Sequence, residues 1–178
     1  MPIDIAQHLQ NHNYSPSIQL RRVAWTVVGL LFRFTPWFCH GFRNTLLRGA
    51  GATIGRGVRI HPTVRITFPW NLKVADHVVI GAHTQLYALA PILIEHDVLI
   101  SHGAHLCAGS HDYTQANLPI AHAPVRVESG TWIAVEAFIG PGVTIGTGSV
   151  VGARAVVMRT MPAKSLVAGN PARVIRPL

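Results

Sequence analysis

The sequence predicts an all-β fold, a parallel β-helix of about five coils, with a helical segment before it and one long loop within it. Three observations carry this prediction: a large aliphatic residue at every sixth position, a smaller residue two positions earlier, and glycine after many of the large ones. A period of six matches neither the 3.6 residues of an α-helix nor the alternation of an ordinary strand. The chain is therefore expected to wind as a solenoid.

The repeat occupies fifteen positions, each of which is Val, Ile or Leu. They are Ile54, Ile60, Ile66, Val74, Ile80, Leu86, Ile94, Ile100, Leu106, Val127, Ile133, Ile139, Ile145, Val151 and Val157. Residues two apart in an extended segment share a face, so smaller residues such as Ala52, Val58 and Ala104 are expected to point inward too. Glycine after Ile54 and Ile80 suits a tight corner. Three hexads then form one triangular coil.

Composition favours one compact unit with an anionic partner. Half of the 178 residues are hydrophobic, and Lys plus Arg outnumber Asp plus Glu by fifteen to seven. Such an excess suits a phosphorylated cofactor, a lipid surface or a nucleic acid. The sequence carries no helix-turn-helix, zinc-finger or aromatic RNA-binding pattern, and its basic residues are scattered, so no nucleic-acid partner is expected.

The sequence favours a cytoplasmic protein that does not cross a membrane. Its two cysteines, Cys39 and Cys107, form neither a disulfide framework nor a metal-binding pair. The polar stretch 1–19 does not resemble a signal peptide, and the apolar stretch 23–34 is shorter than the roughly 20 residues of a membrane span.

Residues 1–49 are expected to form a polar arm and a helical cap, and residues 50–178 the β-helix. One helix is predicted over 20–34, and Thr35-Pro36 predicts the N-cap and first turn of a second that ends near Gly49. The aromatic residues of this segment could cover the open first coil. With the neighbouring arginines they could also form a foot on an anionic membrane. These residues are Trp25, Phe32, Phe34, Trp37, Phe38 and Phe42, with Arg21, Arg22, Arg33, Arg43 and Arg48.

The hexad period has one long interruption, the 21 residues between Leu106 and Val127, which predicts a loop over 107–126. A long excursion from a rigid scaffold is a common place for function. His111 lies near the start of this loop, in the run Gly109-Ser110-His111-Asp112. We therefore select His111 as the candidate catalytic residue.

The repeats, the Gly-Ser-His run and the segment from Pro141-Gly142-Val143 to Gly169-Asn170-Pro171 together resemble the hexapeptide-repeat acyltransferases. The resemblance covers residues 50–178 and implies a left-handed β-helix. It also implies that His111 acts as general base, taking the proton of an acceptor hydroxyl that attacks acetyl-CoA. Either Asp112 or a backbone carbonyl could orient its imidazole.

The resemblance also implies a site for acetyl-CoA near the end of the chain. Pantetheine would run past Val135 and Ala153, which are 18 residues apart, or one coil. Arginine pairs well with phosphate, and small residues let a ligand approach the backbone. The complete set of residues expected to bind the cofactor is Trp132, Ala134, Val135, Ala153, Met158, Arg159, Arg173 and Arg176.

Within this family the chain is similar to the acetyltransferases of colanic acid and exopolysaccharide synthesis, on the basis of Pro69-Trp70-Asn71, the run 107–113 and Asn170-Pro171-Ala172. The implied acceptor is a sugar hydroxyl. One departure from the family pattern is that the run 86–90 lacks the acceptor-binding asparagine of related enzymes. The family also implies a homotrimer, with each active site between two prisms. A lipid-linked sugar at the inner membrane face would account for a membrane foot.

Two other functions fit the same prism. A γ-class carbonic anhydrase binds zinc through three histidines, and this chain has His77, His83, His96, His102 and His105. The pairs six residues apart fall on different prism faces, whereas His83 and His102 could stack, so no metal is expected. A non-catalytic trimeric scaffold would need neither His111 nor the basic C-terminal tail.

Overall fold

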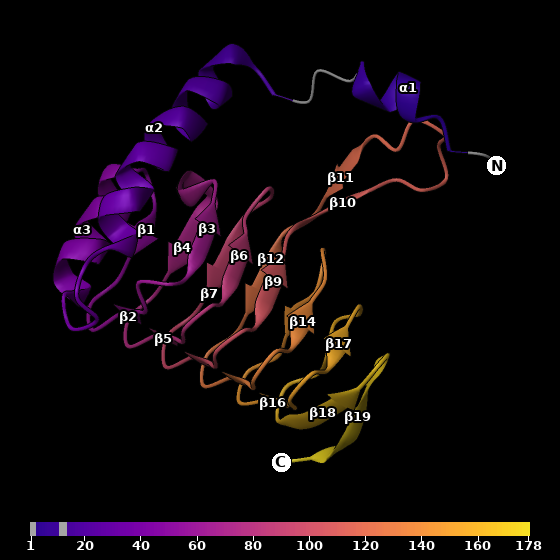
Figure 1. Ribbon diagram of the computed structural model, residues 1–178. Helices are drawn as coiled ribbons and strands as arrows, with labels where there is room; N and C mark the ends of the chain where they lie inside the picture. The colour runs from indigo at the N-terminus through magenta and orange to yellow at the C-terminus, as the bar shows by residue number, and fades with distance from the viewer. Residues whose placement is uncertain (1–2, 11–13) are drawn as a thin grey trace.

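The computed structural model describes residues 3–10 and 14–178 and shows a triangular parallel β-helix (Figure 1). The first sheet contains β1 (Thr53–Ile54), β4 (Leu72–Val74), β7 (Ile92–Ile94), β12 (Val125–Val127) and β15 (Thr144–Ile145). The second contains β2 (Arg59–Ile60), β5 (Val79–Ile80), β8 (Leu99–Ile100), β13 (Trp132–Ile133), β16 (Val150–Val151), β18 (Ser165–Gly169) and β19 (Ala172–Pro177). The third contains β3 (Arg65–Thr67), β6 (Gln85–Tyr87), β9 (His105–Cys107), β14 (Phe138–Ile139) and β17 (Val156–Val157).

The strands make five complete turns, and a bridge from Ile145 to Met161 together with β18 begins a sixth. All fifteen predicted aliphatic positions are buried and belong to one core cluster. The early coils are longer, since Thr53 aligns with Lys73, whereas Arg126 aligns with Thr144. The short 3-10 helix η1 (Pro69–Asn71) takes up extra residues at one such corner. The hexad prediction is therefore confirmed.

Glycine at the corners permits close stacking of the coils. A Cβ on Gly55 would lie 2.6 Å from the backbone carbon of Ala75, and one on Gly81 would lie 2.7 Å from the backbone nitrogen of His102. Neither glycine has a positive φ, whereas His83 and Glu136, at other corners, do. The absence of a Cβ at Gly55 and Gly81 thus serves the approach of the next coil and not a left-handed backbone.

The first predicted helix begins earlier than expected, and the second begins later. Its helices are α1 (Ile5–Leu9), α2 (Pro16–Arg33) and α3 (His40–Gly49). The N-cap of α2 is Ser15, whose Oγ accepts a hydrogen bond from the Ile18 amide. The predicted cap at Thr35 is wrong, because its hydroxyl donates to the Phe32 carbonyl and accepts from Arg43. The short helix α1 was not predicted.

Side chains from α2 and α3 donate hydrogen bonds to the backbone carbonyls at the open edge of the first coil. In this stack the amides of one coil donate to the carbonyls of the next, so the carbonyls of the first coil lack strand partners. Polar side chains supply donors instead: Arg48 to Ile54, Asn44 to Val58, Arg43 to Ile60 and Trp25 to Ile66. The cap is thus polar as well as aromatic.

The prediction that six aromatic residues cover the open first coil is confirmed for two of them and wrong for four. Phe32 is buried and Trp25 packs against the core, but Phe34, Trp37, Phe38 and Phe42 are exposed. The exposed apolar residues of α2, with its C-cap Phe34, recur at helical spacing on the side opposite Trp25 and Phe32. We call this set the outer stripe of α2: Leu20, Val23, Val27, Leu30, Leu31 and Phe34.

The predicted basic foot is wrong for Arg43, which is completely buried. Its guanidinium lacks a carboxylate partner among the described residues and is held by oxygen and nitrogen acceptors of Ile60, Thr35, Pro36, Trp37 and His40. Burial lowers the pKa of Arg43. Within the described ranges, no helix is long and apolar enough to cross a membrane.

Candidate active site

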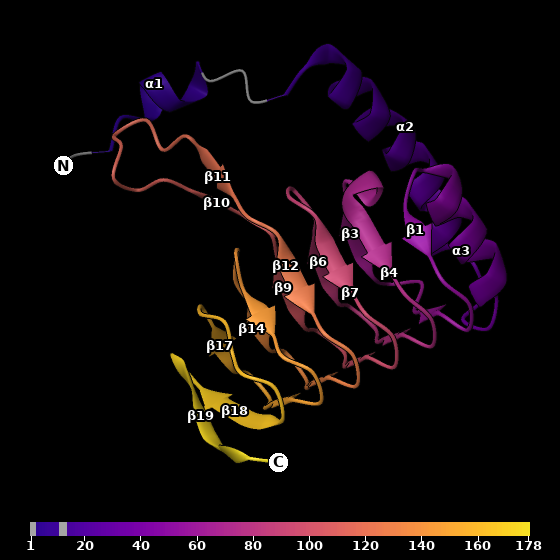
Figure 2. The same cartoon turned by 180° about the vertical axis from the view of Figure 1, so that it is seen from behind.

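The predicted loop is a β-hairpin that projects from the prism (Figures 1 and 2). Its strands are β10 (Gly109–His111) and β11 (Ile120–His122), with His111 opposite Ile120. Strand β10 starts one residue after β9, and Ala108 between them donates to the Tyr87 carbonyl of the neighbouring coil. His111 lies at the far end of β10, so the hairpin, and not the coil itself, fixes its position.

The imidazole of His111 is oriented by a backbone carbonyl. Its Nδ1 lies 2.8 Å from the oxygen of Leu118, which can only accept, so Nδ1 carries the proton and Nε2 keeps its lone pair. Asp112 does not take this role. Its carboxylate accepts hydrogen bonds from Thr114 and Gln115, and these lower the pKa of Asp112. The hairpin backbone thus orients the His111 ring.

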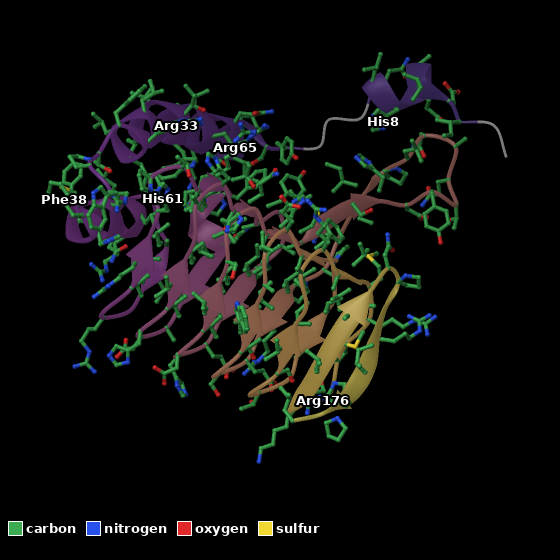
Figure 3. The ribbon with its side chains drawn as sticks, turned by 60° about the horizontal axis from the view of Figure 1, so that its bottom comes forward. His8, Arg33, Phe38, His61, Arg65 and Arg176 are labelled. Carbon is green, nitrogen blue, oxygen red and sulfur yellow. The ribbon has the colours of Figure 1, made fainter. Side chains whose placement is uncertain are left out.

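Helix α1 lies against the hairpin and brings a second histidine to the site, as Figure 3 shows for His8. The Asp4 amide donates to the Ala116 carbonyl at 2.8 Å, and Nδ1 of His8 lies 2.9 Å from the Asn117 carbonyl oxygen. The His8 ring meets the His111 ring edge-on, with centroids 5.4 Å apart. No sequence pattern indicates this contact, because His8 lies in a short polar arm.

The hairpin packs tightly onto the end of β6. A Cβ on Gly109 would lie 2.7 Å from both Leu89 Cδ2 and Tyr87 Cε1, so a larger residue there would have to displace these side chains. Tyr87 is half-buried, and burial is the main cause that raises its pKa. The run 86–90, which lacks the expected asparagine, thus lies directly beneath the strand that carries His111.

Five of the eight residues expected to bind acetyl-CoA lie at two edges of the third sheet, whereas Trp132, Arg173 and Arg176 lie on strands of the second sheet. Ala134 and Val135 follow β13, and Ala153 follows β16. The two corners stack, because the Arg154 amide donates to the Val135 carbonyl at 2.9 Å. Trp132 is 45% exposed, and its Nε1 donates to Ser101 Oγ.

Met158 and Arg159 lie at the opposite edge, directly after β17, at the corner from which the hairpin leaves two coils earlier. Arg159 has no hydrogen bond or ion pair within the described ranges. Arg173 and Arg176, on β19, bond only to nearby backbone carbonyls and are exposed. The structure therefore leaves these guanidinium groups accessible, but it does not gather the eight residues into one pocket of a single chain.

The zinc alternative requires a cluster of metal-binding side chains. No group of three or more His, Cys, Asp or Glu residues that could hold a metal ion occurs in the described part of the chain. His77 and His96 both face Asp97, at 3.5 and 2.9 Å. These contacts explain the lowered pKa of Asp97, for which the hydrogen bond from His96 is the largest cause.

Comparison with known proteins identifies the class. No family model matches the chain. It is 41% identical over 152 residues to WcaF of Escherichia coli, which is named a colanic acid biosynthesis acetyltransferase, with 85% of this chain and 84% of that protein covered. It is 28% identical to the galactoside O-acetyltransferase of Escherichia coli, covering 75% of this chain and 68% of that enzyme.

Solved structures of similar fold support the same class. A hexapeptide-repeat-containing acetyltransferase from Vibrio cholerae, crystallised with acetyl coenzyme A, is 27% identical with a TM-score of 0.85, covering 93% of this chain and 91% of that one. A maltose O-acetyltransferase from Clostridium difficile shares the fold, with a TM-score of 0.86 at 22% identity. The fold is therefore the left-handed β-helix. This chain belongs to the hexapeptide-repeat acetyltransferases, and it is an acyl-transferring enzyme.

Proposed function

We propose that this enzyme transfers the acetyl group of acetyl-CoA to a hydroxyl group of a sugar, in the synthesis of an exopolysaccharide or its lipid-linked precursor. The observation that carries the proposal is the geometry of His111, whose Nδ1 is held by the Leu118 carbonyl while Nε2 is free. The relatives named for colanic acid biosynthesis and galactoside acetylation support the acceptor class.

In the proposed reaction, Nε2 of His111 takes the proton of the acceptor hydroxyl as its oxygen attacks the thioester carbonyl. The imidazolium that forms keeps its Nδ1–H bond to the Leu118 oxygen, which stabilises the positive charge. When the tetrahedral intermediate collapses, the carbon–sulfur bond breaks and His111 returns the proton to the CoA sulfur. The products are the O-acetylated sugar and CoA.

The donor would bind along the edges of the third sheet. Ala134 and Ala153 are small enough for pantetheine to approach the backbone at the corners that also contain Val135. Trp132 and Met158 offer exposed apolar surface, and Arg159, Arg173 and Arg176 offer guanidinium groups for the phosphates. No metal ion takes part in this proposal.

We propose a homotrimer in which each site is completed by a neighbouring prism. In one chain, His111 projects on an exposed hairpin and the donor-binding residues are split between two edges, so a second surface is needed to enclose the thioester. Sedimentation equilibrium should give three times the chain mass.

We also propose a cytoplasmic location with peripheral contact at an anionic membrane, through the outer stripe of α2. This stripe is an apolar surface about 21 Å long, from 14 residues at 1.5 Å each, and Arg33 is exposed beside it. Val27→Gln with Leu30→Gln should reduce cosedimentation with phosphatidylglycerol vesicles. The matched control is Val79→Gln on β5, which is also an exposed aliphatic residue.

The activity test is transfer of a radiolabelled acetyl group from acetyl-CoA to a panel of glycosides, with products identified by mass spectrometry. We expect acetyl esters on sugar hydroxyls that depend on His111. Transfer to amines alone, or thioester loss that does not depend on His111, would overturn the proposal.

A further inference from the structure

A groove of about 540 Å³ lies between α2 and the first strands of the third sheet. Its volume is in the range of small-molecule sites. Helix α2 passes over β3 here, and Figure 3 labels Arg33 and Arg65 in this region. The lining is aromatic, basic and hydroxyl-bearing: Tyr14, Arg22, Trp25, Thr26, Phe32, Arg33, Arg65, Thr67, Phe68 and Tyr87 are its main side chains.

The groove is strongly positive, because three arginines line it and no Asp or Glu does. Arg22 lies over the Tyr14 ring at 4.5 Å and donates to Gln19. The Arg65 backbone amide donates to the Thr84 carbonyl, but the guanidinium groups of Arg33 and Arg65 have no hydrogen bond or ion pair with a described residue. Two unpaired guanidinium groups on opposite walls of one groove indicate an anionic ligand.

The charge extends along the groove. Arg22 and Arg33 are 11 residues apart, which places them on nearly the same side of α2 and about 17 Å apart along its axis. Arg22 lies near Phe68, and Trp25 donates to the Ile66 carbonyl, so the helix runs antiparallel to β3. Continued along the helix, this direction brings Arg33 toward Arg65. The groove therefore suits an elongated ligand with phosphate at one end.

The other end of the groove leads to the catalytic hairpin. Tyr87 lines the groove and also lies against Gly109, two residues before His111. Tyr14 lies against Phe68, with centroids 5.7 Å apart, at this same end. A ligand that extends along the groove past Tyr87 would thus approach the strand that carries the base.

We propose that this groove binds the phosphate groups of a diphosphate-bearing glycosyl acceptor, with Arg33 and Arg65 at the phosphates and the sugar directed past Tyr87 toward His111. This inference rests on the proposed function. The diphosphate could join the sugar to a nucleoside or to a polyprenyl lipid, since both present the same anion to the arginines.

The test is calorimetric titration of the full chain with inorganic diphosphate and with uridine diphosphate, each with and without saturating CoA. We compare the wild type with Arg33→Gln/Arg65→Gln and with Arg59→Gln, an exposed arginine on β2 outside the groove. The groove variant should lose about tenfold or more in diphosphate affinity, because charge-assisted hydrogen bonds are lost. The Arg59 variant should bind as the wild type does.

The titrations in saturating CoA distinguish binding in the groove from binding at the donor site. Diphosphate binding that persists in saturating CoA supports the proposal, and displacement by CoA overturns it. Tighter binding of uridine diphosphate than of inorganic diphosphate indicates a nucleotide-linked acceptor. Retention on phosphatidylcholine vesicles only when they carry a polyprenyl diphosphate indicates a lipid-linked one.

Acetyl-CoA titration of the same samples separates failure of the groove proposal from failure of the proposed function. Wild-type protein that binds acetyl-CoA but not diphosphate refutes the groove alone. Protein that binds neither refutes the proposed function as well. The groove variant should bind acetyl-CoA like the wild type, which shows that it is folded.

Discussion

The role of His111 can be separated from its place in the hairpin by one substitution. In His111→Asn, the side-chain amide can still donate to the Leu118 oxygen that now accepts from Nδ1 at 2.8 Å. The new side chain has no basic nitrogen where Nε2 was. The hairpin should therefore keep its geometry, while the acceptor hydroxyl loses the group that removes its proton.

Loss of a general base lowers turnover by about 10²- to 10⁴-fold, which corresponds to about 2.7–5.4 kcal/mol of transition-state stabilisation. We expect kcat to fall by this factor, with little change in affinity for acetyl-CoA. His111→Ala should be equally inactive and should also lose about 0.5–1.5 kcal/mol of local stability, since the hydrogen bond to Leu118 disappears.

The assay is release of the CoA thiol in the presence of a glycoside acceptor, followed with a thiol-reactive dye. His122→Asn is the matched control, because His122 is an exposed histidine on the partner strand of the same hairpin. Wild-type turnover in His111→Asn would refute the assignment. Equal losses in both variants would indicate damage to the hairpin instead.

Three further predictions concern the cap and the donor site. Arg43→Gln should lower the free energy of unfolding by about 3–5 kcal/mol in urea titration, because it removes a buried, fully bonded cation and orphans its acceptors. Burial, then Arg43, lowers the pKa of His40 from 6.5; the unfolded chain therefore protonates first, stability should fall as pH drops below about 6.5, and His40→Gln should reduce the difference between urea titrations at about pH 8 and pH 5. Ala153→Phe should raise KM for acetyl-CoA by about tenfold or more through loss of space at the third-sheet edge, whereas Ala163→Phe, also exposed but at another corner, should not.

The solenoid could be predicted because its hydrophobic pattern is short and repeats along the sequence. Each of the fifteen hexad positions faces the same narrow core, so the same choice of Val, Ile or Leu recurs. The helical cap was predicted less well, because its side chains form hydrogen bonds with residues far away in the sequence. Thr35 has the pattern of an N-cap but bonds to Phe32 and Arg43, and nothing near Arg43 in the chain shows that it will cap Ile60.

The candidate site also has a part that the sequence predicts and a part that it does not. His111 could be selected from the break in period and its motif, and the carbonyl that orients it was one of two alternatives. The His8 contact joins residues 103 positions apart through hydrogen bonds to a hairpin, with no periodic pattern to reveal it. Arg33 and Arg65 likewise line one groove only because α2 folds back over β3.

The central claim is that this β-helix is an acetyl-CoA-dependent transferase, and titration of the purified, metal-free protein with acetyl-CoA in a calorimeter tests it without knowledge of the acceptor. We predict saturable binding with Kd between about 1 μM and 1 mM, weakened in Ala153→Phe. Absence of binding at millimolar acetyl-CoA would contradict the account.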